Sequence, residues 1–166
     1  MSRGFVKEED QEETPIIPPR AALPSGAINY VTQVGLDLLK AERDNLEKER
    51  IELDTEDENQ RRRDLAVIDG KLNLLQERII SARVLNLADQ PKDEIRFGAT
   101  VKYKMLANNM INSFQIVGVD EANVQNNKIA FVAPIAKAIT GHRKGDVVDF
   151  MLGNETRKLE ILEISY

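Results

Sequence analysis

The chain has no cysteine, no tryptophan and a single histidine, His142. Without cysteine it can form no disulfide, thiol nucleophile or cysteine-rich zinc site, which fits a cytoplasmic location. One histidine excludes multi-histidine metal sites, and we expect His142 to be an ordinary loop residue. No apolar run approaches the roughly 20 residues that span a bilayer, so we expect no membrane association. Five acidic residues between positions 8 and 13 are unlike a secretory signal.

The 166 residues carry a net charge of −5, which argues against binding duplex DNA by neutralising its phosphates. By residue count, segment 30–89 sums to about −4 and segment 90–166 to about +1. The second segment therefore has enough positively charged side chains to bind nucleic acid or an acidic protein.

Residues 1–29 form a tail in which an acidic run leads into four prolines between positions 15 and 24. Such a segment has too few apolar side chains to offset the entropy of ordering, which predicts a disordered leader. The alternative is an extended arm that orders on a partner, with Phe5, Ile16 and Ile17 as its anchors.

Residues 30–87 are predicted to form an antiparallel coiled coil. Thr32 is a suitable N-cap for a first helix, and Gly35 sits in its first turn. Apolar residues then recur at heptad spacing in two helical patterns, 36–53 and 65–82. The heptad positions are Leu39, Leu46 and Leu53, then Leu65, Leu72 and Ile79, with Ile68, Leu75 and Ala82. Gly70 either permits close approach of the first helix or simply costs about 1 kcal/mol.

The link between the two helices is short and acidic, so the helices must fold back on each other. Its carboxylates are Asp54, Glu56, Asp57 and Glu58. They are either solvated turn residues, with Asp54 or Asp57 capping a helix, or part of a functional tip. The run Arg61-Arg62-Arg63 either offsets these acids at helical spacing or contacts RNA.

After a linker containing Pro91 the periodicity changes from helical spacing to two, which indicates strands. Strands are predicted at 99–103, 113–119, 128–132, 147–151 and 158–164, with one short helix at 134–140 that ends before Gly141. Residues 93–166 are therefore expected to form a mostly antiparallel sheet with one short helix, an α+β domain.

The most specific motif is Ala133-Pro134-Ile135-Ala136-Lys137-Ala138-Ile139, followed by Gly141 and Lys144-Gly145-Asp146-Val147-Val148. This block resembles the bacterial transcript cleavage factors of the Gre family, which show a "SPIARAL-G-GD-V" pattern there. Supporting pieces are Thr32-x-x-Gly35, Ala82-Arg83-Val84-Leu85, Phe97-Gly98-Ala99-Thr100-Val101 and Glu160-Ile161-Leu162-Glu163-Ile164-x-Tyr166. The resemblance covers about residues 30–166.

The resemblance implies an antiparallel coiled coil followed by a domain of the FKBP-like fold. That domain would bind RNA polymerase near the secondary channel of the polymerase, and Pro134 and Ile135 would contact the polymerase. The coil would enter the channel, where tip acids at Asp54, Asp57 and Glu58 help to position Mg²⁺ and backtracked RNA is cut. The factor would be a monomer in the cytoplasm. It would have no cofactor and no catalytic centre of its own, because the polymerase supplies the active site and shares its Mg²⁺. Nascent RNA would be a further partner if Arg61, Arg62 and Arg63 contact it.

The sequence departs from the family pattern in three places. The family tip usually reads "GD-x-x-EN". When Glu58 and Asn59 are aligned with its "EN", Thr55 falls where the family has its Asp, although Asp54 and Asp57 keep an acid-x-x-acid spacing. The first helix is about three turns shorter than usual, on the order of 15 Å. Val132 and Ala133 stand before Pro134, where the family often has an acidic residue and a serine.

Two other functions therefore stay open. One is a secondary-channel regulator that binds the polymerase without promoting cleavage. A remote alternative is a peptidyl-prolyl isomerase, because the expected fold is FKBP-like. The low aromatic content, 5%, counts against the aromatic pocket that such an enzyme needs.

Overall fold

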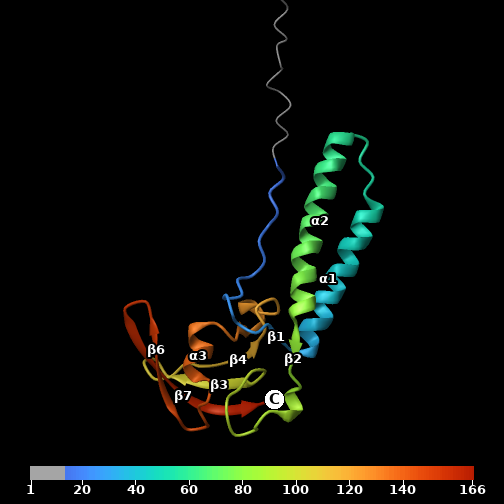
Figure 1. The fold of residues 1–166 in the computed structure, drawn as a ribbon. Coiled ribbons are helices and arrows are strands. Elements are labelled where there is room, and N and C mark those ends of the chain that lie inside the picture. Colours follow the sequence, from blue (N-terminus) through green and yellow to red (C-terminus); the bar gives the residue numbers. More distant parts are fainter. Residues whose placement is uncertain (1–13) are drawn as a thin grey trace, which may run out of the picture.

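The computed structural model describes residues 14–166, so the prediction for Phe5 lies outside the described residues. The chain forms a helical hairpin that projects from a curled sheet domain (Figure 1). Helix α1 (Gln33–Glu52) and helix α2 (Glu58–Ser81) make the hairpin, as the heptad pattern predicts. Within the described residues, no helix is long and apolar enough to cross a membrane.

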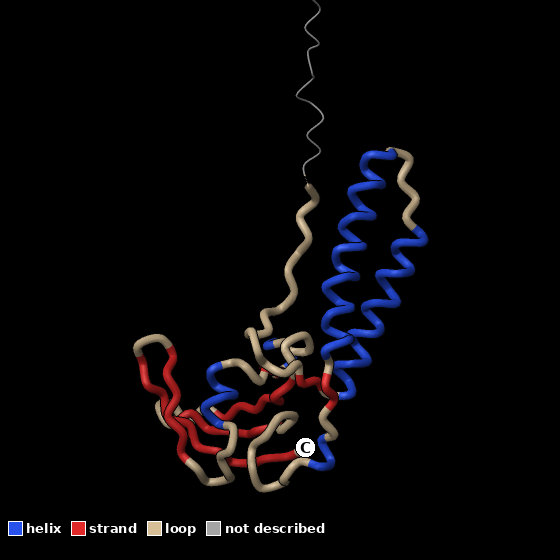
Figure 2. Tube along the Cα trace, viewed as in Figure 1, coloured by secondary structure: helices blue, strands red, loops and turns tan. Residues whose placement is uncertain are grey.

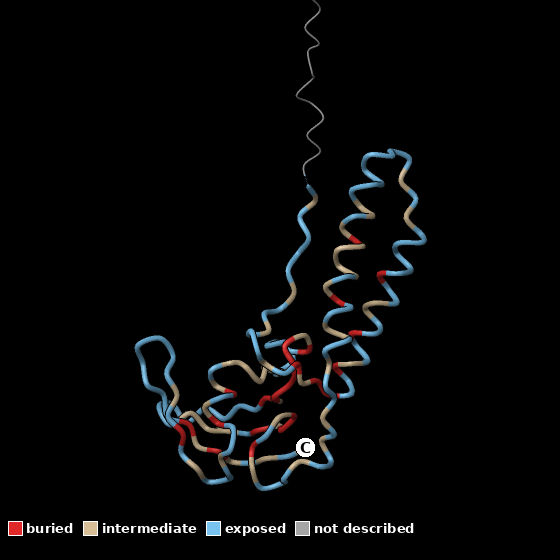
Figure 3. The backbone as a smooth tube through the Cα atoms, in the orientation of Figure 1, coloured by how far each residue is buried: buried red, intermediate tan, exposed pale blue. Residues whose placement is uncertain are grey.

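Side chains of the expected type cap both long helices. Thr32 precedes α1, and its hydroxyl accepts a hydrogen bond of 2.9 Å from the Gly35 amide, which confirms the predicted N-cap. The coil seam contains buried Leu39, Leu46 and Leu75, with Leu72 and Ile79 packed against them. Figure 3 shows that buried positions are few along the two helices, whose remaining length is intermediate or exposed. The seam is narrow, so most of the hairpin surface is exposed.

The sheet domain contains five strands in the order β5-β4-β3-β7-β6. Their bounds are β3 (Thr100–Met105), β4 (Ile111–Val117), β5 (Lys128–Ala130), β6 (Val147–Leu152) and β7 (Glu155–Ser165). Neighbouring strands are antiparallel except for β4 and β5, which are parallel. The short helix α3 (Pro134–Ile139) lies between β5 and β6 in the chain, and 3₁₀ helices cover Leu87–Asp89 and Val124–Asn126. The predicted α+β architecture is therefore confirmed, as Figure 2 shows.

One core holds this domain together. Its buried residues are Ile95, Ala99, Val101, Phe114, Ile116, Ala136, Ile139, Val148, Leu159 and Ile161. Pro134 occupies the first turn of α3, where its fixed φ suits a helix start. Gly141 follows the helix with φ of +87°, which matches the role predicted for it as the terminating glycine.

The base of the hairpin is tied to the sheet domain by contacts that sequence periodicity does not reveal. Two short parallel strands, β1 (Tyr30–Val31) and β2 (Arg83–Val84), pair at the point where the coil begins and ends. The Thr32 hydroxyl donates a 2.6 Å hydrogen bond to buried Glu121, in the turn after β4. Lys128 contacts the other oxygen of that carboxylate at 3.1 Å.

Two glycines allow this close approach of hairpin and sheet. A Cβ at Gly35 would lie 2.8 Å from a Glu121 carboxylate oxygen, and one at Gly118 would lie 2.7 Å from the Tyr30 carbonyl oxygen. Gly35 therefore has a packing reason to be in the first turn of α1, beyond the low cost of glycine at a helix end.

Candidate functional site at the coil tip and beside the short helix

The tip of the hairpin is the exposed link between α1 and α2. Asp57 is the N-cap of α2, and its Oδ1 atom accepts hydrogen bonds from the amides of Asn59 (2.8 Å) and Gln60 (3.2 Å). Such a cap stabilises a helix by roughly 0.5–2 kcal/mol. Of the two residues that the sequence offered as a cap, Asp57 therefore has that structural role.

The other tip acids, Asp54, Glu56 and Glu58, are exposed to solvent. In the described part of the chain, no three acidic or histidine side chains are grouped so that they could hold a metal ion. The tip thus presents carboxylates without a preformed cluster, and a cation there would need ligands from another molecule as well.

Arg61, Arg62 and Arg63 lie in the first turns of α2 and are all exposed, next to the tip acids. Further down the coil, Arg50 of α1 contacts Asp69 of α2 at 2.6 Å and links the two helices. The tip therefore carries both charge signs, with acidic residues in and beside the link and three arginines in the first turns of α2.

Pro134 and Ile135 begin α3 at the other end of the molecule. Pro134 is exposed, while Ile135 is half-buried against the sheet core. Ala133 is the N-cap residue and supplies no side-chain hydrogen bond, so α3 begins without the cap that a serine would provide.

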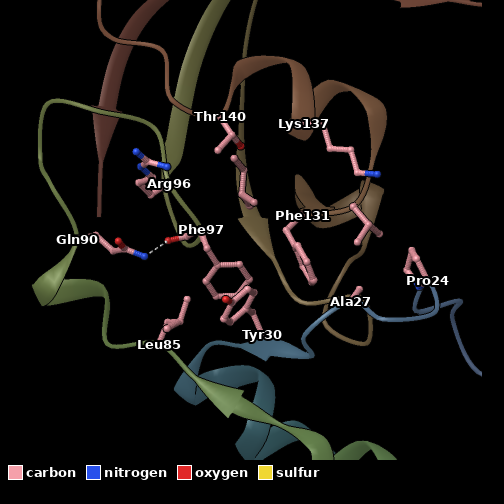
Figure 4. A pocket seen from close by; sticks show the side chains of 12 residues that line it. Pro24, Ala27, Tyr30, Leu85, Gln90, Arg96, Phe97, Phe131, Lys137 and Thr140 are labelled. Carbon is pink, nitrogen blue, oxygen red and sulfur yellow. Dashed lines mark hydrogen bonds between the residues drawn. The ribbon is translucent and has the colours of Figure 1, made fainter.

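A pocket of about 560 Å³ lies beside α3 (Figure 4). The rings of Tyr30, Phe97 and Phe131 meet there, with centroids 5.7–5.9 Å apart in tilted and edge-to-face arrangements. Its other lining residues are Pro24, Ala27, Leu85, Gln90, Arg96, Ile116, Val132, Lys137 and Thr140. These residues come from the tail, the coil base, the sheet and α3, so the pocket forms only when the two parts of the chain pack together.

Cations border this apolar pocket. Lys137 of α3 is exposed, and Arg96 extends from the loop before β3, where it contacts Glu94 at 2.7 Å. No carboxylate is among the described residues that line the pocket. The arrangement suits an apolar or aromatic side chain with an acidic group beside it.

Sequence reasoning missed this pocket and weighed the scarcity of aromatic residues against one. Tyr30, Phe97 and Phe131 come from segments far apart in the chain, so no local motif announces them. A usable signal was that each of them lies near one end of a predicted element: Tyr30 and Phe97 close to a start, and Phe131 one residue before the end of a predicted strand. Scarcity of aromatic residues was the wrong argument, because the fold gathers three of them at one place.

His142 lies in the turn after α3, as the loop prediction states. Its Nδ1 atom is 3.2 Å from Asp146 Oδ2, which also accepts a 2.8 Å hydrogen bond from the Arg143 amide. The backbone hydrogen bond from Arg143 is the main reason why the pKa of the Asp146 carboxyl lies below its usual value. These contacts close a turn, and they place His142 in a structural role.

The fold and its two candidate sites define a two-part protein, in which a sheet domain with a pocket carries a helical hairpin with an acidic tip. Residues 90–166 match the family model described as "Transcription elongation factor, GreA/GreB, C-term". Residues 90–166 are therefore similar to the C-terminal domain of the Gre family, as the motif around Pro134 predicts.

Individual relatives agree with this assignment. The chain is 36% identical over 98 residues to transcription elongation factor GreA of Bartonella henselae, covering 59% of this chain and 62% of the relative. It is 37% identical over 99 residues to the protein of that name from Thermoanaerobacter pseudethanolicus, covering 60% and 63%. The chain thus spans less than two thirds of the length of these curated relatives.

Among solved structures, the GreA factor homolog 1 (Gfh1) protein of Thermus thermophilus aligns with 84% of this chain and 100% of its own. The TM-score is 0.40 and the sequence identity 22%.

Proposed function

We propose that the chain is a transcription elongation factor that binds RNA polymerase through its sheet domain and presents its coil tip to the polymerase active site. The observation that carries this proposal is the GreA/GreB match of residues 90–166, the part of the chain that contains most of the pocket. The hairpin supports it, because an exposed acidic tip on a helical stalk is suited to reaching into a partner (Figure 1).

The docking surface is the pocket together with the exposed start of α3. Val132 and Lys137 line the pocket and flank Pro134 and Ile135 in the chain, so the two features form one surface. An apolar side chain of the polymerase would pack against the aromatic rings, and an acidic neighbour would meet Lys137. Reversal of that charge, Lys137→Glu, is expected to weaken binding, whereas Lys102→Glu, on an exposed position outside the pocket, is not.

At the tip, Asp54 and Glu58 are the better candidates for assisting the polymerase's Mg²⁺, because Asp57 already caps α2 through Oδ1. Carboxylate oxygens are hard ligands that suit Mg²⁺, and a second cation can stabilise both the attacking and the leaving oxygen of a phosphodiester. The polymerase would supply the catalytic centre, so the chain would act as an accessory factor. Arg61, Arg62 and Arg63 would face the displaced nascent RNA.

A second candidate is a regulator that occupies the secondary channel without promoting cleavage. Thr55 stands where the family has an acid, and the Asp57 carboxylate, two residues further on, is engaged in capping. Helix α1 has 20 residues and is therefore about 30 Å long, which limits how far the tip reaches. Both observations favour binding without chemistry.

A cleavage assay on stalled, backtracked polymerase complexes distinguishes these candidates. The variant Asp54→Asn with Glu58→Gln removes two tip charges and keeps the Asp57 cap. The matched control Glu49→Gln with Glu52→Gln removes two charges from α1 outside the link. A cleavage factor shortens the RNA, loses this effect in the tip variant and keeps it in the control. Normal binding with no shortened RNA identifies the non-cleaving regulator instead.

Peptidyl-prolyl isomerase activity is the remote alternative, and the aromatic pocket is the observation in its favour. Catalysed isomerisation of a proline peptide by the wild-type chain, lost on Phe131→Ala, would establish it. Absence of turnover in the wild-type chain would remove this alternative and leave the pocket as a docking surface.

A further inference from the structure

The described part of the tail, residues 14–29, runs in an extended course to the base of the hairpin, without helix or strand (Figures 1 and 2). It contacts both the hairpin and the sheet domain of its own chain. Neither the heptad packing of the coil nor the pairing of the sheet strands requires these contacts, which indicates that they have a separate role.

The first contact lies on α2. A Cβ added at Gly70 would lie only 2.0 Å from Ile17 Cδ1, and the three nearest atoms at this position all belong to Ile17. Gly70 therefore makes room for the tail and not for α1, the neighbour that the sequence suggested. Ile17 keeps 37% of its surface exposed, whereas the adjacent Ile16 is 89% exposed. Ile17 is thus the apolar contact of the tail on the coil.

The second contact joins three parts of the molecule through one guanidinium group. Arg20 donates from Nη1 and Nη2 to the two carboxylate oxygens of Glu42 in α1, at 2.7 and 3.0 Å. Its Nε donates to Asp120, in the turn after β4, at 3.0 Å. Such two-pronged, charge-assisted hydrogen bonds are both strong and directional. One tail residue therefore links the coil to the sheet domain.

Burial strengthens this link. Only 17% of the Arg20 side chain and 6% of the Asp120 side chain are exposed. Arg78 of α2 approaches the second oxygen of Asp120 at 3.8 Å and also donates to the Ala21 carbonyl. Among the described residues, loss of Arg20 would leave the Asp120 carboxylate inside the protein with this 3.8 Å contact as its one ion pair, which is unfavourable.

We propose that residues 14–29 are a strap that fixes the direction of the coil on the sheet domain, with Arg20 as its positioning residue. The consequence of the strap for activity rests on the proposed function, because the direction of the coil decides where the tip lies when the sheet domain is docked on the polymerase. The strap also supplies Pro24 and Ala27 to the wall of the pocket. Its release would therefore alter the docking surface and the coil direction together.

The chain has no native cysteine, so two introduced cysteines can be labelled cleanly in the full-length protein. Spin labels at Glu56→Cys in the tip and Asn154→Cys in the turn between β6 and β7 report the distance between coil and sheet domain. With Arg20 intact we expect a narrow distance distribution. Arg20→Ala is expected to broaden it, and Arg20→Lys, which keeps the positive charge, to restore much of the wild-type width.

Two further variants make the test specific. Arg43→Ala removes an arginine of α1 whose ion pair, within residues 14–166, is with the adjacent Asp44, so the width of the distribution should not change. Gly70→Ala displaces Ile17 while it favours the helix itself, because alanine is the better helix former. It should therefore broaden the distribution without loss of helical circular dichroism, and it carries the test if Arg20→Ala does not fold.

A wild-type distance distribution in both Arg20→Ala and Gly70→Ala would overturn the strap. The measurement is made on the free protein, so its result does not depend on polymerase binding. Conversely, a chain with a fixed coil that fails to bind polymerase would contradict the proposed function and leave the strap intact.

Discussion

The hairpin and the sheet domain are stabilised in different ways. The sheet domain buries ten residues in one continuous core, whereas the coil seam buries only Leu39, Leu46 and Leu75 as a cluster. Short two-helix coils gain little stability alone, so the hairpin depends on its base, at β1, β2 and Glu121, and on the tail. The domain with the large core is also the one that matches the GreA/GreB family model. Two of the three departures from the family pattern, Thr55 and the shorter first helix, lie in the slender hairpin.

The largest expected effect is on the free energy of unfolding, and it compares the core of the sheet domain with the seam of the coil. Leu159→Ala, at a fully buried position of β7, should cost about 2–5 kcal/mol in the free energy of unfolding, because the sheet cannot collapse around the cavity. Leu46→Ala in the coil seam should lie at or below the low end of that range, since Leu46 already has 8% of its surface exposed. Urea unfolding followed by circular dichroism measures both. Equal costs would contradict the contrast between the two regions.

The next prediction concerns the junction. Glu121→Ala removes the acceptor of the Thr32 hydroxyl and the partner of Lys128, and should cost about 1–3 kcal/mol in stability. Glu121→Gln keeps an acceptor for Thr32 and should cost less. We expect amide hydrogen exchange to rise first in α1 and α2. Faster exchange confined to the sheet would show that Glu121 stabilises the domain and not the junction.

A smaller effect is expected at the tip. Asp57→Ala removes the cap of α2 and should lower stability by about 0.5–2 kcal/mol. Asp54→Ala, at an exposed carboxylate without a capping role, should leave the melting temperature nearly unchanged. Thermal unfolding of the two variants compares a structural acid with one available for function. Identical melting temperatures would remove the distinction between the two acids.

The smallest effect is a pH dependence in the sheet domain. The folded-state pKa of Asp146 lies below its unfolded value, mainly because the Arg143 amide donates to its carboxylate. Asp146 therefore contributes stability above the unfolded pKa of about 3.9, and this contribution is lost as the pH falls through the lower folded pKa. Asp146→Asn should flatten stability over this acidic range. Carboxyl titration by NMR checks the shift, and an ordinary pKa for Asp146 would refute it.

Much of the fold was predictable because its signals are local. Heptad spacing predicts the hairpin, Thr32 predicts the start of α1, and Gly141 marks the end of α3. The strand runs are close to those observed, although β5 is parallel to β4 and ends at Ala130. These features depend on neighbours a few residues apart, so the sequence alone suffices to find them.

The rest depends on contacts between distant segments. Tyr30 pairs with Arg83, Arg20 meets Asp120, and three aromatic rings meet in the pocket, each across many residues of chain. No periodicity encodes such contacts. The tip was predictable as acidic but not in its details, because only the helix start shows that Asp57 is the cap. The roles of Asp54, Glu58, Pro134 and Ile135 toward a partner stay predictions.

The most direct measurement is the position of the tip in the complex with RNA polymerase. An iron chelate attached at Glu56→Cys, in a chain with no other cysteine, generates hydroxyl radicals that cleave the polymerase near the tip. We expect cleavage around the polymerase active site, weakened by Lys137→Glu and kept in Lys102→Glu. Cleavage confined to the outer surface of the polymerase, or cleavage unaffected by Lys137→Glu, would contradict this expectation.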